Sequence, residues 1–235
     1  MENPFLQTMK SRTSWRFFGA FMALSVIATY SVTSKYKDSI NESTIKRNAE
    51  LIKTQSQHDS EAQRLKSLLK EKEDKLKVYE VQHKVISEHI RSQNKNLSPQ
   101  KVELYTKTII QESVKRGQSP NYQASILDSE ADFESNPKHA LSYVVGMGGT
   151  NWKQWGSYLK EKGIARCKED LKNPIVAIKA TAEIYAYYMK VYKNNPREAI
   201  TGYKGYCALG RKQANQVVSI ALQLRAKEDK ELRNV

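Results

Sequence analysis

Residues 36–93 contain neither glycine nor proline and are rich in Lys, Glu, Gln, Ser and Leu. This stretch constrains the fold most, because such a composition is typical of a long solvated helix rather than of a hydrophobic core. From Ala62 onward two series of residues recur at seven-residue intervals: Ala62, Leu69, Leu76, His83 and Ile90, and Leu65, Lys72, Tyr79 and Ile86. The pattern predicts either a coiled coil, with self-association through residues 62–90, or a single rigid spacer.

An uncharged run, residues 17–32, precedes this helix and has basic residues on both sides. With its flanking residues it approaches the roughly 20 residues that a membrane-spanning helix needs. A cleaved signal peptide is the alternative, but no small-residue cleavage site follows the run. The sequence therefore predicts an uncleaved transmembrane signal anchor at residues 17–34. The basic residues before it predict a cytoplasmic tail over residues 1–16, with the remainder of the chain outside the cytoplasm.

The pattern changes at residues 94–99, where Ser98 and Pro99 provide a capping hydroxyl and a proline suited to a helix start. We place a boundary here, between a helical stalk at residues 35–97 and a domain at residues 98–235. Helical patterns then cover residues 102–117, 122–132, 152–162, 173–188, 196–203 and 212–225. No segment alternates as a strand would, so the expected fold class is all-α.

The net charge of +14 is concentrated in residues 98–235, which hold 22 basic and 14 acidic residues. A basic surface attracts polyanions of any kind, but no nucleic-acid motif is present and no specific nucleic acid partner is expected. The two cysteines, Cys167 and Cys207, predict either a disulfide in an oxidising compartment or two free thiols. The four histidines form no cluster with the cysteines, so neither a metal site nor a cofactor is expected.

Several motifs of the C-terminal half occur in the order and spacing of one known family. The segments are Gly117–Pro120, Ile126–Phe133, Asn136–Ser142, Gly146–Gly149, Leu171–Pro174 and Ala199–Gly205. Together they resemble the catalytic domain of the soluble lytic transglycosylases, which is goose-lysozyme-like. The resemblance covers about residues 98–225 and implies a lysozyme-like helical domain, preceded here by the anchor and the stalk.

The resemblance implies an enzyme that cleaves the MurNAc–GlcNAc bond of peptidoglycan and leaves a 1,6-anhydro-MurNAc end. Glu130 matches the catalytic acid. A glutamate near a helix end is by itself more often a solvated side chain, and only the matching order of the motifs favours the catalytic role. The matched substrate-binding positions are Tyr203, Gly146, Met147, Gly149, Ser142 and Lys204.

Three departures from the family pattern concern polar residues that help to bind the sugar. Gly149 stands where the family has Gln, Lys204 where it has Asn, and Ala131 where it has Ser. The alternative is therefore a catalytically degenerate scaffold that binds peptidoglycan or partner proteins without cleaving. In both cases we expect a single-pass protein of the bacterial inner membrane with its domain in the periplasm, serving an envelope-spanning machine, or a virion protein acting in phage entry.

Overall fold

A computed structural model describes residues 12–234 of the chain, with side chains from residue 19 onward. Residues 1–11 of the predicted tail (residues 1–16) therefore lie outside the described residues. The side chains of the rest of the tail and of the first two residues of the predicted anchor are not described either. Within the described part, no helix is both long and apolar enough to cross a membrane. The anchor at residues 17–34 stays a prediction.

The described chain is mostly helical, which confirms the predicted all-α class. Its helices are α2 (Arg12–Gln93), α3 (Pro99–Lys115), α4 (Pro120–Ala131), α5 (Trp152–Glu161), the 3-10 helix η2 (Lys168–Lys172), α6 (Pro174–Val191), α7 (Pro196–Lys204) and α8 (Ala208–Arg233). The exception is an antiparallel hairpin of two short strands, β1 (Val144–Val145) and β2 (Thr150–Asn151). Strands of two residues are too short to produce an alternating sequence pattern.

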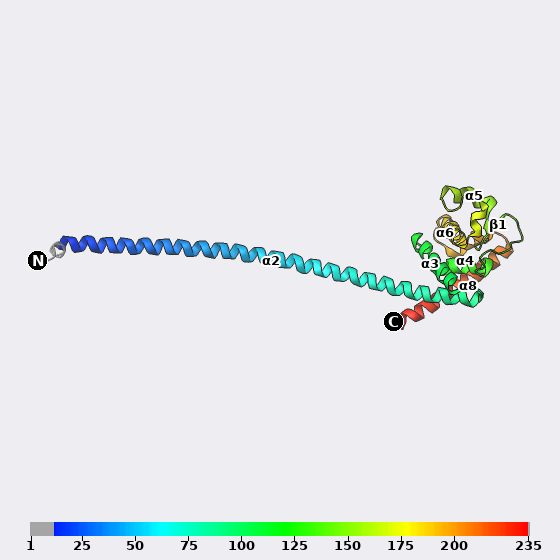
Figure 1. Cartoon of the computed structure of the whole chain (residues 1–235), viewed down its shortest axis with the longest axis horizontal. Coiled ribbons are helices and arrows are strands. Elements are labelled where there is room, and N and C mark those ends of the chain that lie inside the picture. The colour runs from blue at the N-terminus through cyan, green and yellow to red at the C-terminus, as the bar shows by residue number, and fades with distance from the viewer. Residues whose placement is uncertain (1–11, 235) are drawn as a thin grey trace. The chain divides into compact units, whose positions relative to one another are not determined.

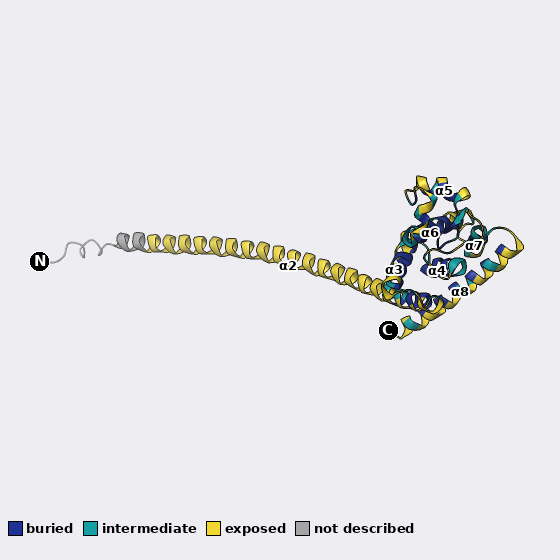
Figure 2. Ribbon diagram, turned by 45° about the vertical axis from the view of Figure 1, so that its right-hand side comes forward, coloured by how far each residue is buried: buried dark blue, intermediate teal, exposed yellow. Residues whose placement is uncertain are grey.

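The chain divides into two compact units. The first unit ends at Glu71, and the second begins at Lys72. In the first unit α2 is a solvated helix, and every side chain described there is exposed (Figure 2). Among these exposed side chains are Leu65 and Leu69, which belong to the predicted coiled-coil seam. Pairing with a second chain there stays a prediction.

The second unit includes the end of α2, which differs from the predicted boundary at residue 98. Val81, Val85, Ile86 and Ile90 of α2 are buried in the main hydrophobic core, together with side chains of α3, α4, α6 and α8 (Figures 1 and 2). Two predicted seam positions, Ile86 and Ile90, are therefore used inside the domain. They are not free to pair with another chain in a coiled coil.

Helix starts in the second unit follow the sequence signals. The Ser98 hydroxyl accepts a hydrogen bond from the Lys101 amide at 3.3 Å, with Pro99 in the first turn of α3. The Asn173 side chain likewise accepts from the Ile175 amide at 2.9 Å, with Pro174 beginning α6. These caps satisfy backbone groups that a helix leaves without partners. They fix where α3 and α6 begin.

Candidate functional site

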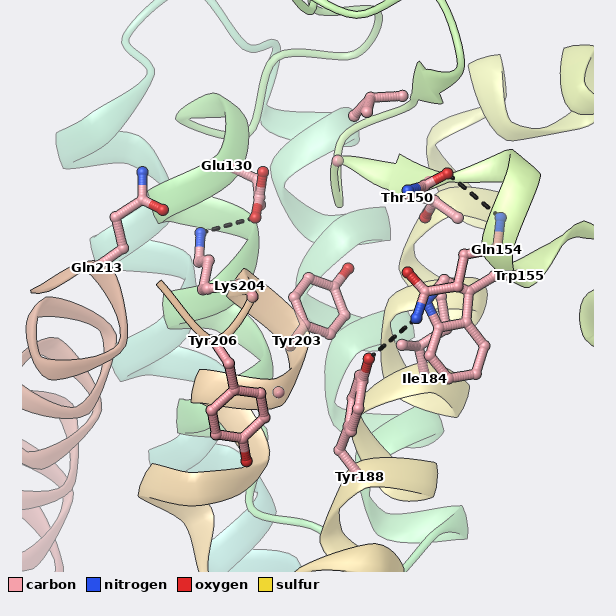
Figure 3. A pocket seen from close by; sticks show the side chains of 15 residues that line it. Glu130, Thr150, Gln154, Trp155, Ile184, Tyr188, Tyr203, Lys204, Tyr206 and Gln213 are labelled. Carbon is pink, nitrogen blue, oxygen red and sulfur yellow. Dashed lines mark hydrogen bonds and ion pairs between the residues drawn. The ribbon is translucent and has the colours of Figure 1, made fainter. Parts of the chain in front are cut away.

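A cavity of about 510 Å³ opens in the second unit at the end of α4 (Figure 3). Its wall combines the last turn of α4, the hairpin, the start of α5, one face of α6 and the end of α7. The lining residues with polar or aromatic side chains are Glu130, Thr150, Asn151, Gln154, Trp155, Tyr188, Tyr203, Lys204, Tyr206 and Gln213. Four predicted site residues line it: Glu130, Gly149, Tyr203 and Lys204.

Glu130 lies in the last turn of α4, which is anchored by the fully buried Ile126 and Leu127. Two residues earlier, the buried Asp128 contacts the Nε2 atom of His89 on α2 at 3.1 Å. The Glu130 side chain faces the cavity and is 19% exposed. It is the one acidic residue among those that line the cavity.

Lys204, the last residue of α7, forms an ion pair with Glu130 (Figure 3). Its ammonium group donates to Glu130 Oε1 at 2.7 Å and to the Ser129 hydroxyl at 2.9 Å. The Lys204 side chain is only 2% exposed, so water screens this pair weakly. The Glu130 carboxylate therefore faces a buried cation, at the position from which a general acid would have to donate a proton.

Tyr203 brings a second polar group from α7 to the cavity. Its hydroxyl donates a hydrogen bond of 2.6 Å to the carbonyl oxygen of Gly148. Burial, followed by the negative charge of Glu130, raises the pKa of the Tyr203 phenol well above its usual range. The phenol is therefore a hydrogen-bond donor at neutral pH, positioned next to the carboxylate.

The loop that joins the two strands passes close to these side chains. Gly149 adopts a positive φ of 59°, and a Cβ atom at this position would overlap the Glu130 carboxylate. Only glycine fits there without displacing Glu130. A larger side chain at position 149, such as that of Gln, would displace the carboxylate.

One wall of the cavity is aromatic. The Trp155 ring meets Tyr188 edge-on with centroids 5.4 Å apart, and Tyr188 stacks on Tyr192 at 6.2 Å. The Gln154 amide also donates to the Tyr188 hydroxyl at 3.4 Å. Trp155 and Tyr188 line the cavity, a position that helical spacing alone does not reveal.

Three predicted substrate-binding residues do not line the cavity. Met147 is fully buried in the main core, and Gly146 is buried with its carbonyl accepting from His139 Nε2 at 2.8 Å. Ser142 is exposed, and its carbonyl accepts from the Lys168 ammonium at 3.3 Å. These residues support the loop and do not bring a polar side chain to Glu130.

Cys167 and Cys207 are both free and exposed, so no disulfide joins them. Each lies at the start of a helix, and the Cys207 sulfur accepts a hydrogen bond from the Gly210 amide at 3.3 Å. Cys207 thus caps α8, whereas the Cys167 thiol donates to Asp170 Oδ1 at 3.5 Å. Among the residues that the structure describes, no group of His, Cys, Asp and Glu side chains could hold a metal ion.

Sequence reasoning did not identify Gln154, Tyr206 and Gln213 as lining residues, because none belongs to a motif that the resemblance covers. Thr150 also lines the cavity, and its buried hydroxyl lies beside the Tyr203 phenol. Comparisons of the chain with family models, with curated proteins and with solved structures found no match.

Proposed function

We propose that the cavity binds the glycan strands of bacterial peptidoglycan and that the domain cleaves them as a lytic transglycosylase. The supporting observation is that Glu130 of α4 and Tyr203 of α7 face the same cavity. These are the two residues to which the family resemblance gives the acid and the adjacent phenol. Trp155 and Tyr188 give the same cavity an aromatic wall.

In the proposed reaction Glu130 donates a proton to the glycosidic oxygen as the bond to the MurNAc breaks. The N-acetyl group of that sugar supports the developing positive charge. The carboxylate of Glu130 then removes the proton from the C6 hydroxyl of the same sugar, which closes the 1,6-anhydro ring. This route needs one carboxylate, unlike hydrolysis by a pair of carboxylates, and the cavity lining contains one.

The ion pair between Glu130 and Lys204 sets a condition on this reaction. The carboxyl group that would donate the proton is held by the buried ammonium of Lys204 at 2.7 Å. The pair must therefore open, or its charge must be compensated, when substrate binds.

The same ion pair favours a second candidate function, a scaffold that binds peptidoglycan or partner proteins without cleavage. A carboxylate held permanently by Lys204 would leave a binding cavity with no acid. The loss of the family's polar residues at positions 149 and 131 supports this candidate as well.

Digestion of purified sacculi by the full chain tests the two candidates. The products are read by mass spectrometry for 1,6-anhydro-MurNAc ends, and sedimentation with the sacculi measures binding. We expect anhydro ends from the parent chain and from Glu134→Gln, an exposed glutamate just beyond α4 that serves as the matched control. Glu130→Gln should still sediment but release none.

Two outcomes would change the proposal. Cleavage by Glu130→Gln at the parent rate would mean that another group is the acid. Binding by the folded parent without any cleavage would favour the scaffold.

We further propose that residues 17–34 anchor the chain in the bacterial inner membrane with the domain in the periplasm, or that the protein belongs to a virion. If the stalk forms a coiled coil, the exposed part of α2 before Val81 is the part that pairs with a second chain. Fractionation of cells that express the full chain, followed by protease treatment of spheroplasts, tests the anchor and its orientation. Release of the intact chain by a high-salt wash would contradict the anchor.

A further inference from the structure

Lys204 is a buried cation with a single anionic partner. Its side chain is 2% exposed, and its acceptors are Glu130 Oε1 and the neutral hydroxyl of Ser129. Among the lining residues Lys204 is also the one cation, as Glu130 is the one anion. The cavity wall is therefore neutral only while Glu130 is charged.

Protonation of Glu130 would break this balance. The ammonium of Lys204 would then be buried beside a neutral carboxyl group and a hydroxyl, with no negative charge in contact. A buried charge that loses its partner is strongly unfavourable. A bound ligand can remove this cost if it brings a negative charge of its own to Lys204.

We propose that the cavity takes saccharides that carry a carboxylate, and that this carboxylate replaces Glu130 as the anionic partner of Lys204. The inference rests on the glycan-binding function proposed above and specifies its substrate class. In peptidoglycan the lactyl group of MurNAc has a free carboxylate only where the stem peptide has been removed. The preferred substrate is then a glycan strand without stem peptides.

The arrival of a second carboxylate has a consequence for protons. Two carboxylates beside one ammonium repel each other, so one of them takes up a proton from the solvent. The titratable groups that line the cavity are Glu130 on α4, Tyr188 on α6, Tyr203 and Lys204 on α7, and Tyr206. The ammonium nitrogen of Lys204 has no site for a further proton.

The three phenols hold their protons as well, because the pKa of each lies above its usual range: burial raises it for Tyr188 and Tyr203, and partial desolvation, followed by the neighbouring Tyr192, raises it for the exposed Tyr206. Glu130 is the one carboxylate among the lining residues, so the proton is shared between it and the carboxylate of the sugar. Binding of the anionic sugar would thus supply the proton that the proposed acid must donate.

Calorimetric titration of the full chain with two tetrasaccharides tests this inference. One is chitotetraose, which is neutral, and the other is a GlcNAc–MurNAc repeat with free lactyl carboxylates. Titrations at pH 7 in two buffers with different ionisation enthalpies measure proton uptake. We expect the anionic saccharide to bind about tenfold more tightly and to take up close to one proton, and chitotetraose to take up none.

Three variants separate the roles of the two residues. Lys204→Gln should lose the preference for the anionic saccharide, whereas Lys204→Arg should keep it. Glu130→Gln should keep the preference and lose the proton uptake. Lys227→Gln, an exposed lysine of α8 outside the cavity lining, is the matched control and should behave as the parent chain does.

Equal affinity for the two saccharides, or a preference that survives in a folded Lys204→Gln variant, would overturn the inference. Failure of the folded parent to bind either saccharide would overturn both the inference and the glycan-binding function. If the preference and proton uptake are found but sacculi are not cleaved, only the proposed catalysis fails.

Discussion

Gly149 lies against the carboxylate of Glu130 so closely that a Cβ atom at position 149 would overlap Oε2. The two residues come from different elements, the loop between β1 and β2 and the last turn of α4. The backbone of the loop therefore determines where the carboxylate can lie in the cavity.

This contact predicts that Gly149→Ala destabilises the domain. The alanine would adopt an unfavourable positive φ and would also displace Glu130, at a combined cost of about 2 to 3 kcal/mol. Gly163→Ala is the matched control, since Gly163 has a similar φ of 65° with open space around it. Denaturant unfolding measures both variants. Equal losses of stability would mean that the loop moves away from Glu130 freely.

A second prediction concerns the ion pair of Glu130 and Lys204. Glu130→Gln leaves the buried ammonium without its anion, and we expect the free energy of unfolding to fall by about 2 to 3 kcal/mol. Adding Lys204→Met should recover part of this loss, because the unpaired charge is then removed. A double-mutant cycle in denaturant gives the coupling energy, which we expect to exceed about 1 kcal/mol. Additive effects would contradict the pairing.

A third prediction follows from the end of α2 in the core. Ile86→Ala and Ile90→Ala should each destabilise the domain by about 2 to 4 kcal/mol, since both side chains are fully buried. Leu69→Ala, on an exposed turn of the same helix, should change stability by less than about 0.5 kcal/mol. Thermal unfolding of the three variants provides the comparison. Small effects of all three would place the domain boundary near residue 98 after all.

A fourth prediction concerns pH and Glu228 of α8. Burial raises the pKa of this carboxyl above its ordinary value of 4.5, although Asn121 donates a hydrogen bond of 2.9 Å to it. An acid with a raised pKa in the folded state contributes stability below pH 4.5, and this contribution is lost as the pH rises through the raised pKa. Glu228→Gln should remove this loss.

Unfolding of the parent and of Glu228→Gln in urea, measured from pH 4 to pH 8, checks the fourth prediction. The stability of the variant relative to the parent should increase with pH and then level off. Glu134→Gln, an exposed change, should show a constant difference. A difference for Glu228→Gln that does not vary with pH would contradict the raised pKa.

Much of the fold could be predicted from local signals. The caps at Ser98 and Asn173 and the glycine turns at Gly117 and Gly163 act within a few residues of the chain, and the structure confirms the helix boundaries they indicate. The boundary of the domain could not be predicted in this way. Ile86 and Ile90 have a spacing that suits both a coiled coil and the buried face of a single helix.

The site could be predicted only in part. The motifs identified Glu130 and Tyr203 separately, and the structure brings both to one cavity. The ion pair with Lys204 joins residues 74 positions apart, and no local pattern encodes such a contact. Asp128, two residues before Glu130, is buried against His89 because α2 packs on that face of α4, and no local pattern indicates this contact either.

The contact between the two ends of the second unit affects how the protein can be synthesised. Lys84 of α2 contacts Glu231 of α8 at 2.7 Å, and Leu224 of α8 belongs to the same core as Val81 and Ile90. A ribosome releases the α2 residues long before α8. The nascent chain therefore cannot complete this core until α8 has been synthesised, and until then the apolar side chains that α8 covers need protection from aggregation.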